Sequence, residues 1–176
     1  MPLLKNNTIV PDTWIQAGDD VAIFPNADVV VSFARLLKEW ESLSKHQGRL
    51  GVVFGNADRA EALSLFLPKL SLIILPFPAF VDGRAYSIAR QFREFGYRGE
   101  LRATGNILPD QLQFMLQVGF DAFEISDRFP LAQWQQAARQ MSLAYQRGLF
   151  RRGSEAEVWT ERHTDAEPWL EQPHAG

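Results

Sequence analysis

Residues 70–95 read LSLIILPFPAFVDGRAYSIARQFREF, and this stretch decides the class of fold. Its first six residues are almost all apolar, which is typical of a strand covered on both faces of a sheet. Prolines end that strand, and from about Gly83 the apolar residues recur every three or four positions, which predicts a helix to Phe95. A strand followed by a helix is the repeating unit of an α/β fold with a parallel sheet.

The same unit occurs three more times around this stretch. Apolar strands are expected at residues 50–54, 100–104 and 120–125, and helices over about 58–66, from 109, and over 130–146. Four strand–helix units are half of an eight-fold barrel. The sequence therefore favours a parallel half-barrel slightly over a small open doubly wound sheet. A half-barrel has two open edges, which must be covered, rolled up by the N-terminal segment, or paired with a second copy.

The ends of the chain differ from this repeating body. Residues 8–24 are predicted to form a β-hairpin that turns at 17–19, and a helix is expected over 28–43. Residues 1–147 are thus expected to be a single α/β domain. Residues 148–176 carry three arginines against six acidic residues, with Trp159 and Trp169 among them, and are predicted to be a polar C-terminal extension.

The composition excludes several kinds of chemistry. The 176 residues include no cysteine, which excludes disulfides, thiolate nucleophiles and cysteine-bound zinc or iron–sulfur clusters. The three histidines show no ligand spacing, so neither a metal nor another cofactor is predicted. A net charge of −3 offers no footprint for nucleic acid, and no apolar run is long enough to cross a membrane. We expect a cytoplasmic protein.

The carboxyl ends of the strands hold the first candidate site, because ligands of parallel α/β proteins bind there. Asp82, Gly83 and Arg84 follow the strand at 70–75, and Gly105 and Asn106 follow the strand at 100–104. A glycine beside a first helical turn lets an anion approach backbone N–H groups, and Arg84 could clamp that anion. The alternative, which the sequence favours, is that Asp82 only caps the helix and Arg84 lies in solvent.

Arg102 and Glu124 form the second candidate site. Side chains alternate between the two faces of a strand, so Arg102 shares a face with Glu100 and Thr104, and Glu124 shares a face with Ala122. If the two strands are neighbours, Arg102 and Glu124 can meet on that face. A buried charge is costly unless it is paired, which makes such a pairing structurally necessary. A catalytic role for either residue is the alternative interpretation.

A partner surface is predicted on two of the helices. Arg90 and Arg93 fall opposite the apolar face of the helix over 83–95, so they are interpreted as a solvated face or a partner contact. In the helix that begins at 109, Phe114 and Val118 widen the apolar arc. This width suggests a homo-oligomer interface, with deeper burial inside the monomer as the alternative.

Three segments resemble a known family: FPAFVDGRAYSIAR at 77–90, GELRATGNIL at 99–108 and GFDAFE at 119–124. They are similar to bacterial domain of unknown function family 934, specifically over 77–124 and more loosely from 20 to 146. The resemblance implies a setting in assimilatory sulfite reduction, since members accompany sulfite reductase and are described as probable oxidoreductases or accessory proteins. The family pattern has Gly-Asp where this chain has Gly105-Asn106, so no catalytic carboxylate is carried over to position 106.

The resemblance implies, as the leading hypothesis, an accessory protein that acts with sulfite reductase and has no redox centre of its own. Arg90, Arg93 and the tryptophans of the extension are its candidate contacts. The alternative is a small oxyanion-binding, oxidoreductase-like enzyme with its site at the C-terminal ends of the strands, and a third possibility is a purely structural homo-oligomer. A pocket lined by Arg84, Arg102 and Glu124 would favour the enzyme, and a filled pocket with an exposed arginine and aromatic face would favour the accessory protein.

Overall fold

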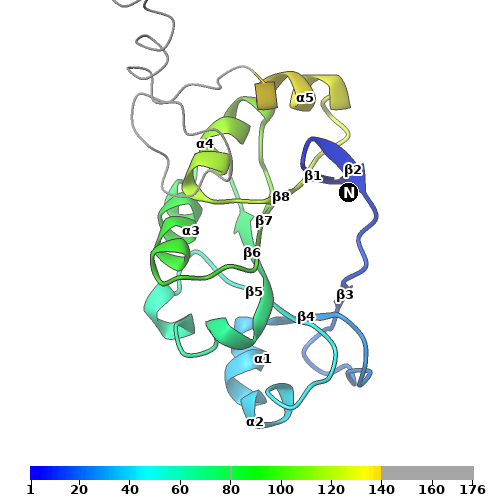
Figure 1. The fold of residues 1–176 in the computed structure, drawn as a ribbon, viewed down its shortest axis with the longest axis vertical. Coiled ribbons are helices and arrows are strands. Elements are labelled where there is room, and N and C mark those ends of the chain that lie inside the picture. Colours follow the sequence, from blue (N-terminus) through cyan, green and yellow to red (C-terminus); the bar gives the residue numbers. More distant parts are fainter. Residues whose placement is uncertain (80, 140–176) are drawn as a thin grey trace, which may run out of the picture.

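Eight strands form one curled sheet within residues 1–79 and 81–139, the part of the chain that the computed structural model describes (Figure 1). Six neighbouring strands, from β3 through β8 in chain order, are parallel, β1 pairs antiparallel with β8, and β2 lies outside β1. The strands are β1 (Leu3–Lys5), β2 (Thr8–Val10), β3 (Ile15–Gln16), β4 (Val29–Ser32), β5 (Leu50–Val53), β6 (Leu70–Phe77), β7 (Glu100–Gly105) and β8 (Ala122–Glu124).

Helices cover one face of this sheet, because every second residue of the central strands is apolar and points toward them. On β6, for example, Ile73, Leu75 and Phe77 belong to the main core together with the apolar face of α3. Burying each such side chain contributes about 1.5–3 kcal/mol. The helices are α1 (Phe33–Lys38), α2 (Trp40–Leu43), α3 (Arg84–Glu94), α4 (Leu112–Val118) and α5 (Leu131–Arg139).

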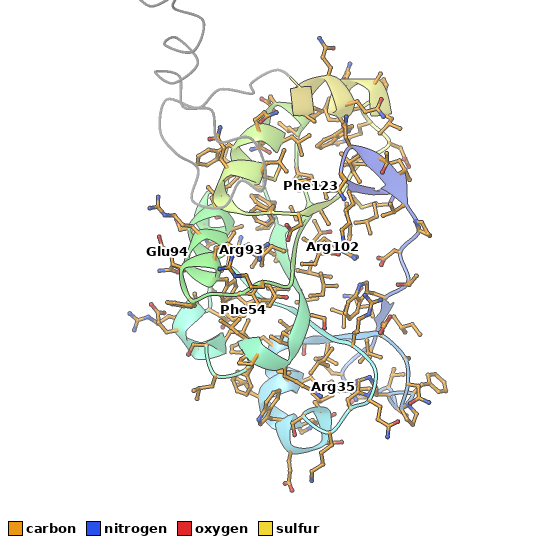
Figure 2. All side chains as sticks on the ribbon, viewed as in Figure 1. Arg35, Phe54, Arg93, Glu94, Arg102 and Phe123 are labelled. Carbon is orange, nitrogen blue, oxygen red and sulfur yellow. The ribbon has the colours of Figure 1, made fainter. Side chains whose placement is uncertain are left out.

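The other face of the sheet is concave and has a mixed character. Val30, Leu72 and Ile74 form a small second cluster there, packed against Trp14. On β7 the residues paired with Leu72 and Ile74 are the charged Glu100 and Arg102, and Glu124 of β8 contacts Arg102. Figure 2 shows the result, with Arg102 on the opposite side of the strands from α3 and Arg93. The concave face therefore changes from apolar at β4–β6 to polar at β7–β8.

A four-residue segment, Pro11–Trp14, closes this concave face, and we call it the strap. It joins β2 to β3, which lie at the two opposite edges of the sheet. Because an extended chain spans about 3.5 Å per residue, the two edges must approach to within roughly 20 Å. The sheet is therefore a half-barrel whose edges are tied together by the chain itself. Gly51 leaves room for the strap, since a Cβ there would lie 3.3 Å from the Trp14 ring.

The four predicted strands of the repeating body are confirmed as β5, β6, β7 and β8, and they pair in the predicted parallel direction. The sheet as a whole is mixed rather than purely parallel, because β1 joins it antiparallel. The expected helix over 58–66 is wrong, since only short 3₁₀ turns form at Ala60–Leu63 and Leu67–Lys69.

An N-terminal hairpin is present and helices form within 28–43, but both differ from their predicted bounds. The hairpin lies at 3–10 rather than 8–24, and its turn is Asn6-Asn7, where both residues have positive φ. Asparagine tolerates that conformation, which suits a two-residue hairpin turn. The helix expected over 28–43 begins only at Phe33, after the Ser32 cap. The valines at 29–31 form β4 instead, because their side chains are buried on the two faces of the sheet.

Among the described residues, no helix has the length and apolar character needed to span a membrane. The predicted C-terminal extension at 148–176 and the predicted continuation of the last helix to 146 lie outside the described residues.

Candidate functional site

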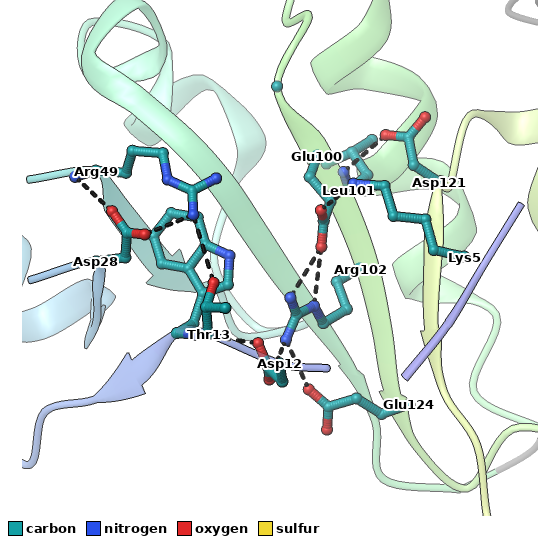
Figure 3. A network of polar contacts seen from close by, with 12 residues as sticks. Lys5, Asp12, Thr13, Asp28, Arg49, Glu100, Leu101, Arg102, Asp121 and Glu124 are labelled. Carbon is teal, nitrogen blue, oxygen red and sulfur yellow. Dashed lines mark hydrogen bonds and ion pairs between the residues drawn. The ribbon is translucent and has the colours of Figure 1, made fainter. Parts of the chain in front are cut away.

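Arg102 lies on β7 and points into the concave face, where it contacts three carboxylates (Figure 3). It donates to Glu100 at 2.9 and 3.0 Å, to Asp12 at 2.7 Å and to Glu124 at 3.4 Å. Only 1% of Arg102 is exposed. The structure thus brings Arg102 and Glu124 together, as strand alternation predicts, and adds two more acidic groups.

The charge of this cluster is negative. Burial lowers the pKa of Arg102, but its hydrogen bond to Asp12 and the charge of Glu100 outweigh that effect, and the pKa is raised. Lys5 adds a second cation, 2.7 Å from Glu100. Two cations therefore face three carboxylates, which leaves about one negative charge. Thr104 donates at 2.7 Å to Oε2 of Glu124, the carboxylate oxygen that Arg102 does not contact. An approaching anion would be repelled, and Arg102 is already occupied.

The cluster also fastens the strap to the sheet. Asp12, in the strap, is bound by Arg102, as Figure 3 shows. Arg49 holds the strap from the other side, with its guanidinium 4.8 Å from the centre of the Trp14 ring and paired with Asp28. The hydrogen bond from Arg49 holds the pKa of the Asp28 carboxyl below its usual value. Through these contacts Arg102 and Arg49 stabilise the position of the strap on the concave face of the sheet.

The Asp82-Gly83-Arg84 segment precedes and starts α3, where Asp82 accepts from the backbone N–H of Arg84 at 3.2 Å. The Arg84 guanidinium also donates to Asp82, at 2.8 and 2.9 Å. Asn56 donates to the same carboxylate at 3.2 Å. The Arg84 hydrogen bonds hold the pKa of Asp82 far below its usual range. Gly83 is the N-cap residue of α3 and no described side chain caps this helix, so Asp82 is not the cap that the alternative predicts. The largely exposed Arg84 folds back on Asp82 instead of lying unpaired in solvent.

Gly105 and Asn106 form a tight turn at the end of β7. Gly105 has φ +93°, and a Cβ there would lie 2.6 Å from the Phe77 carbonyl oxygen, so only glycine fits. The Asn106 backbone N–H donates to the same carbonyl at 2.8 Å, and its side-chain amide donates to the Pro78 carbonyl at 2.7 Å. The turn is therefore fixed against the end of β6.

This turn borders a hollow of about 510 Å³ beyond the carboxyl ends of β6, β7 and β8, which we call the carboxyl-end hollow. Among the residues that the structure describes, Arg128, in the loop after β8, is the one lining residue with a charged side chain. Arg84, Arg102 and Glu124 do not line it. The lining residues are Met1, Pro78, Ala79, Gly105, Asn106, Ile107, Leu108, Ser126, Arg128 and Phe129.

The prediction of an exposed Arg93 is wrong, because Arg93 is 9% exposed. Its guanidinium donates to the carbonyls of Tyr97 and Gly99 at 2.9 Å and to that of Gly119 at 2.7 and 3.0 Å, and it pairs with Asp121. An arginine in the last turn of a helix can reach past the helix end and satisfy free carbonyls. Arg93 thus joins α3 to the loops that precede β7 and β8, and it is not part of an exposed partner surface.

The other three predicted partner residues remain on the outer layer. Arg90 is exposed and pairs with Glu94 one helical turn later. Phe114 on α4 is 52% exposed, and its ring lies 4.9 Å from that of Tyr86 on α3. Val118 is half-buried one turn after Phe114. Tyr86, Arg90, Phe114 and Val118 are defined here as the α3–α4 face.

Sequence reasoning gave no role to Asp12 or Lys5, and it placed Arg128 only among the residues at the carboxyl ends of the strands, where ligands bind. Asp12 and Lys5 reach the concave face only because the sheet curls and the strap crosses it, and no local pattern signals that path. Arg128 does follow a predicted strand, so its position at a carboxyl end was a usable signal.

A comparison with protein-family models matches residues 51–154, more than half of the chain, to the family described as "Bacterial protein of unknown function (DUF934)". No curated protein matches the chain.

Proposed function

The chain belongs to the DUF934 family, and we propose that it is an accessory protein of assimilatory sulfite reduction that binds sulfite reductase. The resemblance described above supplies this biological setting. The proposal assigns the protein a binding role and no redox step of its own.

The observation that carries the proposal is the state of the two arginines that an oxyanion-binding enzyme would require. Arg84 is bound to Asp82 through two guanidinium nitrogens, and Arg102 is surrounded by Glu100, Asp12 and Glu124. Sulfite would have to displace a carboxylate at either position. These contacts favour protein binding over oxyanion chemistry at the predicted residues.

The α3–α4 face offers chemistry suited to a protein partner. An aromatic pair, Tyr86 and Phe114, lies on the neighbouring helices α3 and α4. Arg90, one turn after Tyr86, forms an exposed pair with Glu94, and Val118 adds an apolar group one turn after Phe114. Tyrosine and arginine are enriched among the residues that dominate binding energy at interfaces, and aromatic residues are enriched at interfaces in general. The exposed half of the Phe114 ring would be buried on binding.

The test is capture of partners by the tagged full-length protein from bacteria grown on sulfate as sole sulfur source. Wild type should retain sulfite reductase, and the double variant Arg90→Glu/Phe114→Ala should lose it. The double variant Lys38→Glu/Phe24→Ala is the matched control, since it makes the same kinds of change at exposed positions near α1 and in the β3–β4 connection.

Each result decides a separate point. If wild type retains only copies of itself, the accessory role is wrong and a homo-oligomer is supported. If both double variants retain sulfite reductase as well as wild type does, the partner is right and the α3–α4 face is wrong.

A further inference from the structure

We propose that the carboxyl-end hollow binds a small organic anion, with Arg128 pairing with an oxyanion head and the apolar walls holding the body of the ligand. The inference is independent of the accessory role. It concerns a different part of the surface and a different chemical class of partner.

The location is the first support. The hollow lies beyond the carboxyl ends of three adjacent parallel strands, where parallel α/β sheets place their ligands. Its volume of about 510 Å³ falls within the usual range for small-molecule sites.

The charge of the hollow is the second support. Arg128 is the one charged side chain in its lining, and its guanidinium has no ion-pair or hydrogen-bond partner among residues 1–79 and 81–139. Arg84, Arg90, Arg93 and Arg102 are each paired with a carboxylate. A guanidinium presents a planar set of N–H donors that matches a carboxylate, phosphate or sulfonate.

Two neutral groups add hydrogen-bonding capacity. The Ser126 hydroxyl oxygen accepts from the Arg128 backbone N–H at 3.2 Å, so its own O–H remains able to donate to an anion. Asn106 commits one amide hydrogen to Pro78, which fixes its orientation and leaves the second amide hydrogen for a ligand. Ser126 and Asn106 thus stand at the ends of neighbouring strands, in the same lining as Arg128.

The remaining lining selects the type of anion. It consists mainly of apolar groups, which include Pro78, Ile107, Leu108 and Phe129. An inorganic ion would leave these walls in contact with water, whereas an anion with an apolar or aromatic body would cover them. The ligand class is therefore an organic anion with one oxyanion head.

The experiment is a titration of the full-length, isotope-labelled protein with phenyl phosphate, in which the NMR chemical shifts of the backbone amides are measured at each addition. Inorganic phosphate supplies the head alone, and benzyl alcohol supplies the ring without the charge. We expect saturable shifts at residues 105–108 and 126–129 with phenyl phosphate, and binding weaker by about ten-fold or more with either partial probe.

Arg128→Gln should weaken phenyl phosphate binding by about ten-fold or more, and Arg128→Lys should retain part of it. Arg59→Gln is the control, because Arg59 is exposed and does not line the hollow. Unchanged affinity in Arg128→Gln, shifts confined to other regions, or no binding of phenyl phosphate would each overturn the site. Equal affinity for inorganic phosphate would overturn the role of the apolar walls.

Discussion

Arg102, within β7, and Arg128, in the loop after the neighbouring strand β8, differ in burial and in the charged groups around them. Arg102 is buried and bound by three carboxylates. Arg128 is exposed and lines a hollow to which residues 1–79 and 81–139 contribute no acidic side chain. The first holds the strap on the concave face, and the second is open to a ligand. The carboxylates around an arginine thus decide whether its guanidinium stabilises the fold or stays available to a ligand.

The largest expected difference between the two regions is in stability. Arg102→Ala should lower the free energy of unfolding by about 3–5 kcal/mol, because it leaves three carboxylates facing one another without their shared cation. Arg128→Ala should change it by no more than about 0.5 kcal/mol, as is usual for an exposed side chain. Urea denaturation of both variants measures the difference. An Arg102→Ala variant as stable as wild type would show that the cluster does not hold the strap.

The two glycines of the predicted anion site sharpen the comparison. Gly105→Ala should destabilise by about 1–3 kcal/mol, because its φ is +93° and a Cβ would strike the Phe77 carbonyl. Gly83→Ala should cost less than about 1 kcal/mol, since a Cβ there meets nothing within 4 Å and φ is −78°, and only the preference of the N-cap position for glycine over alanine is lost. Thermal unfolding compares the two, and equal loss of stability in both variants would contradict the turn described at the hollow.

The smallest expected effect concerns pH. Because the Asp28 pKa is lowered in the folded protein, its pairing with Arg49 adds stability above the unfolded pKa of about 3.8, and this stability is lost as the pH falls toward the folded value. Asp28→Asn should therefore have a shallower fall in melting temperature below about pH 4. Identical curves for wild type and variant would remove Asp28 from the contacts that secure the strap.

The sequence predicts the regions of this fold that are buried on both faces. β5 and β6 carry apolar runs because helices cover one side and Trp14 of the strap packs on part of the other. β7 and β8 include polar residues on the concave side, and they are found because they repeat the strand–helix unit. By contrast, β1, β2 and β3 are two or three residues long, and their pairing is set by distant strands. Valines at 29–31 could extend a helical pattern until the tertiary structure buries them in β4.

The residues of the candidate sites also differ in how well the sequence predicts their contacts. Alternation along β7 and β8 was enough to predict that Arg102 meets Glu124, because both strands lie within the regular part of the sheet. A helical wheel could not predict the burial of Arg93, since its long side chain reaches beyond the end of α3 to loop carbonyls. The freedom of Arg128 depends on which carboxylates lie nearby, and that is known only from the folded chain.

The most direct test of the contrast between engaged and free arginines is one titration carried out on two variants. Phenyl phosphate affinity is measured by NMR for Arg84→Gln, in which the arginine bound to Asp82 is removed, and for Arg128→Gln. The account predicts that Arg84→Gln binds within about two-fold of wild type, while Arg128→Gln binds about ten-fold more weakly or not at all. A loss of affinity in Arg84→Gln with none in Arg128→Gln would contradict it and return the anion site to the start of α3.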